Sequence, residues 1–365
     1  MSDRSNDASA RELAEIACAF ALDGAVVEVR RHGSGHIHDT FVSAVRRADG
    51  SLGRCLHQRI NQRVFASPGQ VMENIARVTD HLRAKIVEEG GDPDRGTLTI
   101  VPAASGAALH TTDRGECWRT FRFIEGARSF DTARDAAHAF EAASAFGRFV
   151  RLLGDLPGPR LHETIPRFAD PAGRHADLLA AVDADVAGRV RLVGAELRFV
   201  EQHDGLVREA RELFAPGALP ERVVHHDTKI NNVLVDDSTG TAVCVVDLDT
   251  TMPGRVLYDF GDLVRLGATR AAEDERDLGR VVVDPDCLAA IRRGYRAETR
   301  GFLTRDEDAA LDRAGPLVTL TIGMRFLTDF LEGDRYFKVR REGQNLDRCR
   351  VHFALVRDLL SRAAR

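Results

Sequence analysis

One short polar segment carries the residue types that phosphoryl transfer requires. It reads HHDTKINN over residues 225–232 and places Asp227, Lys229 and Asn232 in a D-x-K-x-x-N spacing. Asp247 follows fifteen residues after Asn232, at the end of an apolar stretch. A carboxylate can orient or deprotonate an acceptor hydroxyl, a cation can neutralise the transferred group, and an amide oxygen with a second carboxylate can hold Mg²⁺. The ordered set therefore predicts a phosphotransferase site, although any one of these residues alone would be an ordinary solvated side chain.

A glycine-containing loop is a second candidate for contact with phosphate. Gly33, Ser34 and Gly35 lie between two predicted strands, at residues 25–30 and 40–46. The loop that covers nucleotide phosphates in kinases has this position, whereas the glycine loop of a dinucleotide site lies between a strand and a helix. We therefore expect this loop to contact a nucleotide.

Hydrophobic patterning predicts a β-rich N-terminal part with one prominent helix. Strands are expected at residues 25–30, 40–46, 54–60, 97–101, 107–111 and 118–124. The dipeptide Asp49-Gly50 predicts a hairpin turn between the second and third of these strands. The helix begins at Ser67-Pro68, and its apolar side chains recur at helical spacing: Val71, Ile75, Val78, Leu82 and Ile86.

The chain beyond Gly126 is mainly helical. Helices are expected at about residues 133–153, 177–214, 286–298, 317–331 and 345–362, with a short β region over 223–248. We therefore predict an α+β fold of two lobes, with a nucleotide-binding lobe at residues 1–124 and a catalytic and substrate-binding lobe at residues 125–365. The segment 121–126 is the expected hinge.

Composition excludes several classes of protein. The 365 residues are 44% apolar and 29% charged, with a net charge of −5, as expected for a globular protein. The chain has no run of five like charges, so a nucleic-acid partner is not expected. It also has no stretch of 18 consecutive apolar residues, so a membrane-spanning helix is not expected. The N-terminus does not have the pattern of a signal peptide, and the six scattered cysteines are typical of reduced, mostly buried thiols. A soluble cytoplasmic protein, monomeric or homodimeric, is the resulting expectation.

Longer segments resemble a known family. HDTKINNVLVD and VVDLDTTMPGRVLYDFGDLVR are similar to the catalytic region of the aminoglycoside phosphotransferase and protein-kinase-like superfamily. With QRINQRVFASPGQVMENIARVTDHLR, LHETIP and RFLTDFLEGDRYF, the resemblance narrows to the N-acetylhexosamine 1-kinases and extends over about residues 33–353. It implies a bilobal kinase-like fold in which Asp227 is the catalytic carboxylate, Lys229 meets the γ-phosphate, and Asn232 and Asp247 bind the metal.

One feature departs from the protein-kinase pattern. A kinase carries a lysine on its third strand, paired with a glutamate on the following helix. The whole chain has three lysines, and none falls on that strand. Arg59 on the strand and Glu73 on the helix are candidates for a substitute pair, with a surface ion pair of little consequence as the equal alternative. In the expected hinge, the backbone of Phe123 and Ile124 would pair with adenine, while their side chains are expected in the core.

The remaining candidates concern the acceptor. The family resemblance places Arg325 and Tyr336 on the sugar, and a bidentate arginine beside an aromatic ring suits a hydroxyl-rich ring. Asp249 is a candidate metal or substrate ligand, and His38 in the first loop is a candidate contact to the acceptor, although a lone loop histidine is more often neither. Two further acidic residues, Asp259 and Asp262, are expected to brace the catalytic loop.

The predicted activity is transfer of the γ-phosphoryl group from MgATP to the anomeric hydroxyl of an N-acetylhexosamine. An alternative is a phosphotransferase that acts on another hydroxyl of an aminoglycoside, aminosugar or cyclitol, because acceptor pockets differ among proteins that share a catalytic loop. A binding protein with a degenerate kinase fold is a third hypothesis, which the complete catalytic set disfavours.

Overall fold

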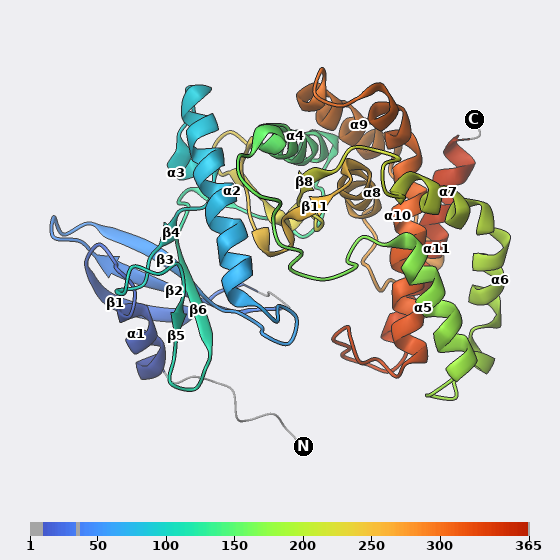
Figure 1. The fold of residues 1–365 in the computed structure, drawn as a ribbon, viewed down its shortest axis with the longest axis horizontal. Helices are drawn as coiled ribbons and strands as arrows, with labels where there is room; N and C mark the ends of the chain where they lie inside the picture. The colour runs from blue at the N-terminus through green and yellow to red at the C-terminus, as the bar shows by residue number, and fades with distance from the viewer. Residues whose placement is uncertain (1–9, 34–36, 364–365) are drawn as a thin grey trace. The chain divides into compact units, whose positions relative to one another are not determined.

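The computed structural model describes residues 10–33 and 37–363, and the chain divides into two compact units (Figure 1). Unit 1 takes in Met1–Ala127 together with His162–Ile165, and unit 2 takes in Arg128–Leu161 and Pro166–Arg365. The division lies three residues beyond the expected one at residue 124, and it assigns a short later segment to unit 1.

Unit 1 is built on an antiparallel sheet of six strands. Their order is β1-β2-β3-β6-β4, with β5 also paired to β6. The bounds are β1 (Ala25–Arg31), β2 (Asp39–Arg46), β3 (Leu52–Arg59), β4 (Ile100–Val101), β5 (His110–Thr111) and β6 (Cys117–Arg122). All six predicted strands form, although β4 and β5 are shorter than expected. The predicted turn between β2 and β3 also forms: Gly50 has a φ of +83°, and the N–H of Ser51 donates to the Asp49 carboxylate at 2.9 Å.

The predicted helix is α2 (Pro68–Glu88), and the five apolar residues expected on one face are all buried. Ser67 precedes it, but the Ser67 side chain accepts no capping hydrogen bond. Asn74 on the buried face explains why a distant segment belongs to unit 1. Its amide nitrogen donates to the carbonyl of His162 at 2.8 Å, and its amide oxygen accepts from the N–H of His162 at 3.0 Å. The short helices α1 (Ala10–Cys18) and α3 (Pro93–Gly96) complete this unit, and β7 (Ala127–Arg128) lies where the chain passes to unit 2.

Unit 2 is mainly helical. Its helices are α4 (Ala136–Leu152), η1 (Leu153–Asp155), α5 (Pro171–Ala184), η2 (Val190–Leu192), α6 (Gly194–Gln202), α7 (Asp204–Phe214), η3 (Ile230–Asn232), η4 (Leu248–Thr250), α8 (Val256–Gly267), η5 (Leu278–Arg280), α9 (Pro285–Thr299), α10 (Arg305–Leu331) and α11 (Gln344–Ala363). Figure 1 shows α10 and α11 side by side, and α10 also packs against α8 and α5, while α4 packs against α9.

Helix α10 begins twelve residues earlier than its apolar pattern indicated. Thr304 and Glu307 form a capping box, in which each side chain bonds to the backbone of the other residue. The helix then continues through Pro316, whose missing N–H would end an isolated helix. Burial of most of α10 against its neighbours outweighs the lost hydrogen bond.

Two small antiparallel pairs of strands interrupt the helices of unit 2. Strand β8 (Arg222–Val224) pairs with β11 (Met252–Gly254), and β9 (Val233–Asp236) pairs with β10 (Ala242–Val245). Both connections between the two pairs, residues 225–232 and 246–251, carry sequence-predicted site residues. The strand pairs therefore hold these two loops from both ends.

All six cysteines are free thiols, and five of them are buried, as predicted. In the described part of the chain, no helix combines the length and the apolarity needed to cross a membrane.

Candidate active site

Residues 225–232, after β8, form the proposed catalytic loop, and a carboxylate from α8 holds this loop in place. Both oxygens of Asp259 accept hydrogen bonds from this loop, one from the N–H of His225 and one from the N–H of His226, each at 2.7 Å. Burial raises the pKa of Asp259 to about 7, although these two hydrogen bonds oppose the rise. The bracing role predicted for Asp259 is confirmed.

Two residues in the connecting loops adopt the left-handed conformation. His226 has a φ of +65° and Asp247 a φ of +62°, a region that non-glycine residues rarely occupy. Around His226 this conformation is enforced, because its Nδ1 donates to the carbonyl of Thr250 at 3.1 Å and its ring lies against Gly254. A Cβ atom at Gly254 would lie 2.5 Å from Nε2 of His226. Such strained positions persist where the surroundings over-determine them, which is typical of functional sites.

The predicted catalytic residues are brought together. The ammonium group of Lys229 lies 2.9 Å from Oδ1 of Asp227. The amide nitrogen of Asn232 donates to the carbonyl of Asp227 at 2.8 Å and to its Oδ2 at 3.1 Å. Burial would raise the pKa of Asp227, but the charge and hydrogen bond of Lys229 outweigh burial and lower it. The Asp227 carboxylate is therefore ionised at neutral pH and can accept a hydrogen bond from an acceptor hydroxyl.

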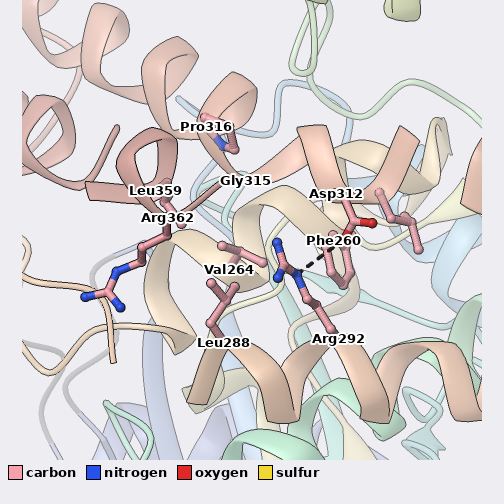
Figure 2. Close-up of a pocket in the computed structure, with 10 residues that line it drawn as sticks. Phe260, Val264, Leu288, Arg292, Asp312, Gly315, Pro316, Leu359 and Arg362 are labelled. Atoms are coloured by element: carbon pink, nitrogen blue, oxygen red, sulfur yellow. Dashed lines mark ion pairs between the residues drawn. The ribbon is translucent and has the colours of Figure 1, made fainter. Parts of the chain in front are cut away.

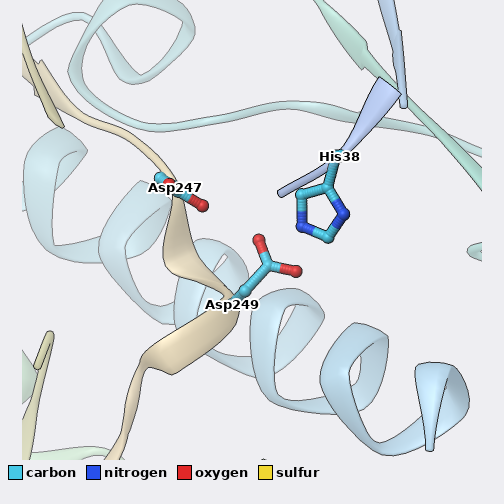
Figure 3. Close-up of side chains that lie close together, drawn as sticks. All are labelled: His38, Asp247 and Asp249. Carbon is cyan, nitrogen blue, oxygen red and sulfur yellow. The ribbon is translucent and has the colours of Figure 1, made fainter. Parts of the chain in front are cut away.

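Oxygen atoms suited to a hard cation occur in the same region. Because the amide nitrogen of Asn232 is engaged by Asp227, its amide oxygen is the atom left to bind a metal. Asp247 is exposed and immediately precedes η4, and the buried Asp249 lies within η4 (Figure 3). An amide oxygen and carboxylates are the donor set that Mg²⁺ prefers. The residues present therefore fit a divalent metal, with Asn232 and Asp247 as the proposed ligands.

Asp262 is the second brace predicted from the sequence, and the structure confirms it. Its Oδ2 accepts from the N–H of Thr228 at 3.0 Å, between the two charged residues of the catalytic loop. Its Oδ1 accepts two hydrogen bonds from Arg265, at 2.7 and 2.9 Å. The spacing of Asp262 and Arg265 on one helical face is a signal that sequence reasoning missed.

The proposed acceptor residues lie in one cationic and aromatic cluster of unit 2. The guanidinium carbon of Arg325 is 5.7 Å from the ring centre of Tyr336, 5.6 Å from that of Phe337 and 5.1 Å from that of Phe168. Phe168 also makes an edge-to-face contact with His226, with ring centres 5.8 Å apart. Arg325 is therefore connected to the catalytic loop through a single ring, that of Phe168, which the sequence did not single out.

In unit 1, the suggested ion pair between Arg59 and Glu73 does not form, which corrects the sequence-based suggestion. Arg59 pairs with Asp39, its cross-strand neighbour on β2, and with Glu116 at 2.6 Å. Glu73 instead contacts Nε2 of His162 at 2.9 Å. Strand register brings Asp39 opposite Arg59, so the arginine is neutralised within the sheet.

The other candidates in unit 1 have local partners. The ring of Phe123 is half-buried under the guanidinium of Arg54, at 3.9 Å, and its N–H donates to the carbonyl of Arg54 at 3.0 Å. Ile124 is buried as expected, whereas Phe123 packs against Arg54 rather than in the core. His38, immediately before β2 (Figure 3), stacks on Phe65 and accepts a hydrogen bond from the N–H of Asn61 at 3.1 Å.

The described residues include the first glycine of the predicted glycine loop. Gly33 has a φ of +70°, as a turn between β1 and β2 requires. Ser34 and Gly35 lie outside the described residues.

A separate pocket in unit 2 contains none of the predicted site residues. It lies among α8, α9, α10 and α11 (Figure 2), and its wall is largely apolar. Each of its three charged side chains is paired: Arg292 with Asp312 at 3.3 Å, and Arg362 with Asp358 at 3.1 Å. This pocket therefore offers no group for phosphoryl transfer.

The β-sheet unit, the helical unit and the braced loop define an α+β fold of the protein-kinase-like class. The chain belongs to the phosphotransferase enzyme family, whose sequence model matches residues 36–302. It is therefore a phosphotransferase that acts on a hydroxyl acceptor, and the hypothesis of a binding protein without activity is not supported.

Solved structures of similar fold cover nearly the whole chain. An aminoglycoside phosphotransferase from Alicyclobacillus acidocaldarius matches with a TM-score of 0.59 and 14% identity, over 99% of this chain and 98% of that chain. A microcompartment-associated aminopropanol kinase matches with a TM-score of 0.54 and 17% identity, over 97% and 98%. An amicoumacin kinase, solved with AMP-PNP and Ca²⁺, matches with a TM-score of 0.58 and 13% identity, over 95% and 93%. At these identities the likeness shows the fold.

Proposed function

We propose that this phosphotransferase transfers the γ-phosphoryl group of ATP to the anomeric hydroxyl of an N-acetylhexosamine and releases the sugar 1-phosphate. The family membership supports the reaction class, and the resemblance of VDLDTTMPG and RFLTDFLEGDRYF to N-acetylhexosamine 1-kinases supports the acceptor. In this proposal unit 1 binds the nucleotide through Gly33, its loop neighbours and the segment of Phe123 and Ile124. The amicoumacin kinase of similar fold was solved with an ATP analogue, which agrees with ATP as the donor.

The proposed chemistry is direct in-line transfer. Asp227 accepts the hydrogen bond of the attacking hydroxyl and orients it, and the pair with Lys229 keeps this carboxylate ionised. Lys229 supplies positive charge for the transferred phosphoryl group. Mg²⁺, held by Asn232 and Asp247, would neutralise charge on the nucleotide phosphates.

The observation that carries the choice of acceptor is the cluster around Arg325. It combines a guanidinium with three aromatic rings and connects to the catalytic loop through Phe168. Arg174 lies near enough that the charge of Arg325 adds to burial in lowering the pKa of Arg174. Arg174 is paired with Asp177 at 3.3 Å, so the proposed donor to the acceptor is Arg325, and a guanidinium among aromatic rings suits a neutral sugar that accepts hydrogen bonds on its oxygen atoms. A hemiacetal hydroxyl is also more acidic than an ordinary alcohol, so it requires less help from a base.

The test is an acceptor assay that separates the anomeric hydroxyl from the others. The enzyme is incubated with MgATP and either N-acetylglucosamine or N-acetylgalactosamine, and ADP release and the loss of reducing sugar are followed together. We expect both signals with the free sugars and neither with their methyl glycosides, in which O1 is blocked. Activity is expected to disappear with EDTA and to return with Mg²⁺ or Mn²⁺.

A second candidate follows from the relatives of similar fold, which are an aminoglycoside phosphotransferase and an aminopropanol kinase. In this alternative the acceptor is another hydroxyl of an aminoglycoside, aminosugar or cyclitol. Phosphorylation of the methyl glycosides as fast as the free sugars would contradict the anomeric proposal. Turnover of a panel of amine-bearing acceptors in place of the N-acetylhexosamines would then favour the alternative.

A further inference from the structure

Arg265 on α8 joins the brace of the catalytic loop to two other segments of unit 2. It is almost fully buried, with 4% of the side chain exposed. Its Nε and Nη2 donate to one oxygen of Asp262, and its Nη1 lies 3.0 Å from the Glu273 carboxylate and 2.9 Å from Nε2 of His352. These partners come from α8, from the loop before η5 and from α11.

The protonation of His352 follows from its partners. Arginine has no acceptor atom, so Nε2 of His352 accepts the hydrogen bond from Arg265. The proton is then on Nδ1, which donates to the carbonyl of Arg348 at 2.6 Å. A neutral imidazole adds no second positive charge, so Arg265 is the cation that directly bridges Asp262 and Glu273.

The network reaches the catalytic loop through Asp262, whose two carboxylate oxygens bond to different partners. Arg265 holds Oδ1 of Asp262, and Oδ2 accepts from the N–H of Thr228. Thr228 lies between Asp227 and Lys229, so the orientation of the Asp262 carboxylate determines where that peptide group lies. The hydroxyl of Thr228 is also held, by the carbonyl of Asp259 at 2.6 Å.

Lys229 is within electrostatic reach of the same acidic groups. The charges of Glu273 and Asp262 add to that of Asp227 in acting on Lys229. Without the guanidinium between them, Asp262 would lose its cationic partner on α8 and Glu273 would keep Arg348 at 3.7 Å, so both carboxylates would compete more strongly with Asp227 for the ammonium group. Arg265 thus opposes displacement of Lys229 from the catalytic carboxylate.

We propose that Arg265 is a positioning residue for phosphoryl transfer: by holding Asp262 and Glu273 it fixes the Thr228 peptide and keeps Lys229 paired with Asp227. Arg265 acts through Asp262 and touches neither substrate. The inference rests on the proposed catalytic role of Asp227, but not on which sugar is the acceptor.

The experiment compares Arg265→Met and Arg265→Lys with the matched control Arg296→Met. Arg296 on α9 also bridges two carboxylates, those of Asp308 and Asp312, away from the catalytic loop. For each variant kcat, the KM for ATP, the KM for the acceptor and the thermal midpoint are measured, with assays well below every midpoint. The acceptor is whichever hydroxyl compound the wild-type enzyme phosphorylates.

We expect Arg265→Met to lower kcat on the order of ten- to a hundredfold, while the KM for ATP changes little, since groups that orient a reacting residue have effects of this size. Arg265→Lys should recover part of kcat, because lysine restores the charge without the paired hydrogen bonds. Arg296→Met should lower the thermal midpoint but leave kcat unchanged. Wild-type kcat in folded Arg265→Met, or equal losses of kcat in the Arg265→Met and Arg296→Met variants, would overturn the proposal.

If Arg265→Met does not fold, Arg265→Lys and Asp262→Asn decide the question, because asparagine keeps the size of the Asp262 side chain and removes the charge that Arg265 holds. Both should have a lower kcat than Arg296→Met, and wild-type kcat in both would overturn the inference. Failure of the proposed function gives a different result. If N-acetylhexosamines are not substrates, the acceptor proposal fails while the comparison proceeds with another acceptor. If Asp227→Asn keeps full turnover, the catalytic assignment itself is wrong.

Discussion

Asp227 and Asp247 are both acidic residues in loops, but their surroundings predict different chemistry. Asp227 accepts hydrogen bonds from the side chains of Lys229 and Asn232, which hold its carboxylate in one orientation. Asp247 is exposed and lies in a left-handed turn before η4. The first arrangement suits a group that orients a nucleophile, and the second suits a metal ligand that must be reached from outside.

Substitution of these two residues should therefore separate catalysis from nucleotide binding. Asp227→Asn should lower kcat by about a hundredfold or more, because a positioned acid or base contributes about 10²–10⁴-fold, with nearly unchanged affinity for MgATP. Asp247→Asn should instead weaken the Mg²⁺-dependent binding of nucleotide. Steady-state kinetics and calorimetric titration with a non-hydrolysable ATP analogue provide the two measurements. Wild-type turnover in Asp227→Asn would show that the loop is wrongly assigned.

A second prediction at the scale of residues concerns the acceptor. Arg325→Lys removes the planar guanidinium that lies over Tyr336, Phe337 and Phe168. The KM for the acceptor should rise about fivefold, because lysine cannot make the second hydrogen bond of a planar guanidinium and one hydrogen bond contributes about 1 kcal/mol, and the KM for ATP should not change. Arg313→Lys is the control, because Arg313 is on the same helix and pairs with Glu209 at the surface. An equal KM for the acceptor in both variants would exclude Arg325 from the acceptor site.

At the scale of elements, the position of the catalytic loop depends on the packing of α8 against α10. Gly261 lies between the two bracing residues Asp259 and Asp262. A Cβ atom at this position would lie 2.5 Å from the backbone oxygen of Ala314 and 2.5 Å from Cγ2 of Val318. Only glycine therefore allows α8 to approach α10 closely enough to place both carboxylates under the loop.

Gly261→Ala should consequently reduce both stability and activity. Forcing a methyl group into this contact should lower the free energy of unfolding by about 1–3 kcal/mol, the usual cost of overpacking, and kcat should fall with it as α8 shifts. Gly205→Ala is the matched control: Gly205 lies in the first turn of α7, with no atom within 4 Å of the added Cβ, and the substitution should not lower the free energy of unfolding. Denaturant unfolding and kcat are the measurements. An unchanged free energy of unfolding in Gly261→Ala would mean that α8 and α10 are less closely packed than these distances indicate.

For the whole molecule, buried histidines determine how stability responds to acid. Burial lowers the pKa of His57 in unit 1 and of His352 in unit 2 to about 4. His57 lies between the hydroxyl groups of Ser43 and Thr120, at 2.8 Å from each. His352 accepts a hydrogen bond from Arg265, and this cation disfavours its protonation further. Each unit therefore contains a histidine that is neutral when folded.

Stability should fall as the pH drops below 6.5. In the unfolded chain each histidine takes up a proton near pH 6.5, while in the folded chain it does so only near pH 4. Between these values the unfolded state binds more protons, so each histidine lowers the free energy of unfolding by up to about 1.4 kcal/mol per pH unit. The raised pKa of Asp259 acts in the opposite direction, because the folded state binds that proton below about pH 7, but the two histidines together outweigh this single group. Thermal midpoints measured from pH 8 to 5 should therefore decline below 6.5. His57→Gln should make this decline shallower, and an identical pH profile in that variant would contradict the assignment.

The sequence by itself determined the class of reaction, the proposed catalytic residues and most helices and strands. The proposed catalytic set lies within 21 positions of the chain, from Asp227 to Asp247, so its spacing could be read directly. Most strands and helices could be predicted from the periodic recurrence of apolar residues, because that period follows from local backbone geometry. The start of α10 could not be predicted in this way, because a helix that passes through Pro316 is maintained by packing.

Only the tertiary structure decided which distant charges and rings meet. Arg59 pairs with Asp39 because of strand register, Arg265 meets Glu273 and His352 across three segments, and Phe168 connects Arg325 to the catalytic loop. A charged residue has several partners of suitable sign in the sequence, and the short range of hydrogen bonds makes the choice depend on position in space. Residue types and spacing therefore indicated the class of reaction, whereas the supporting network required the folded chain.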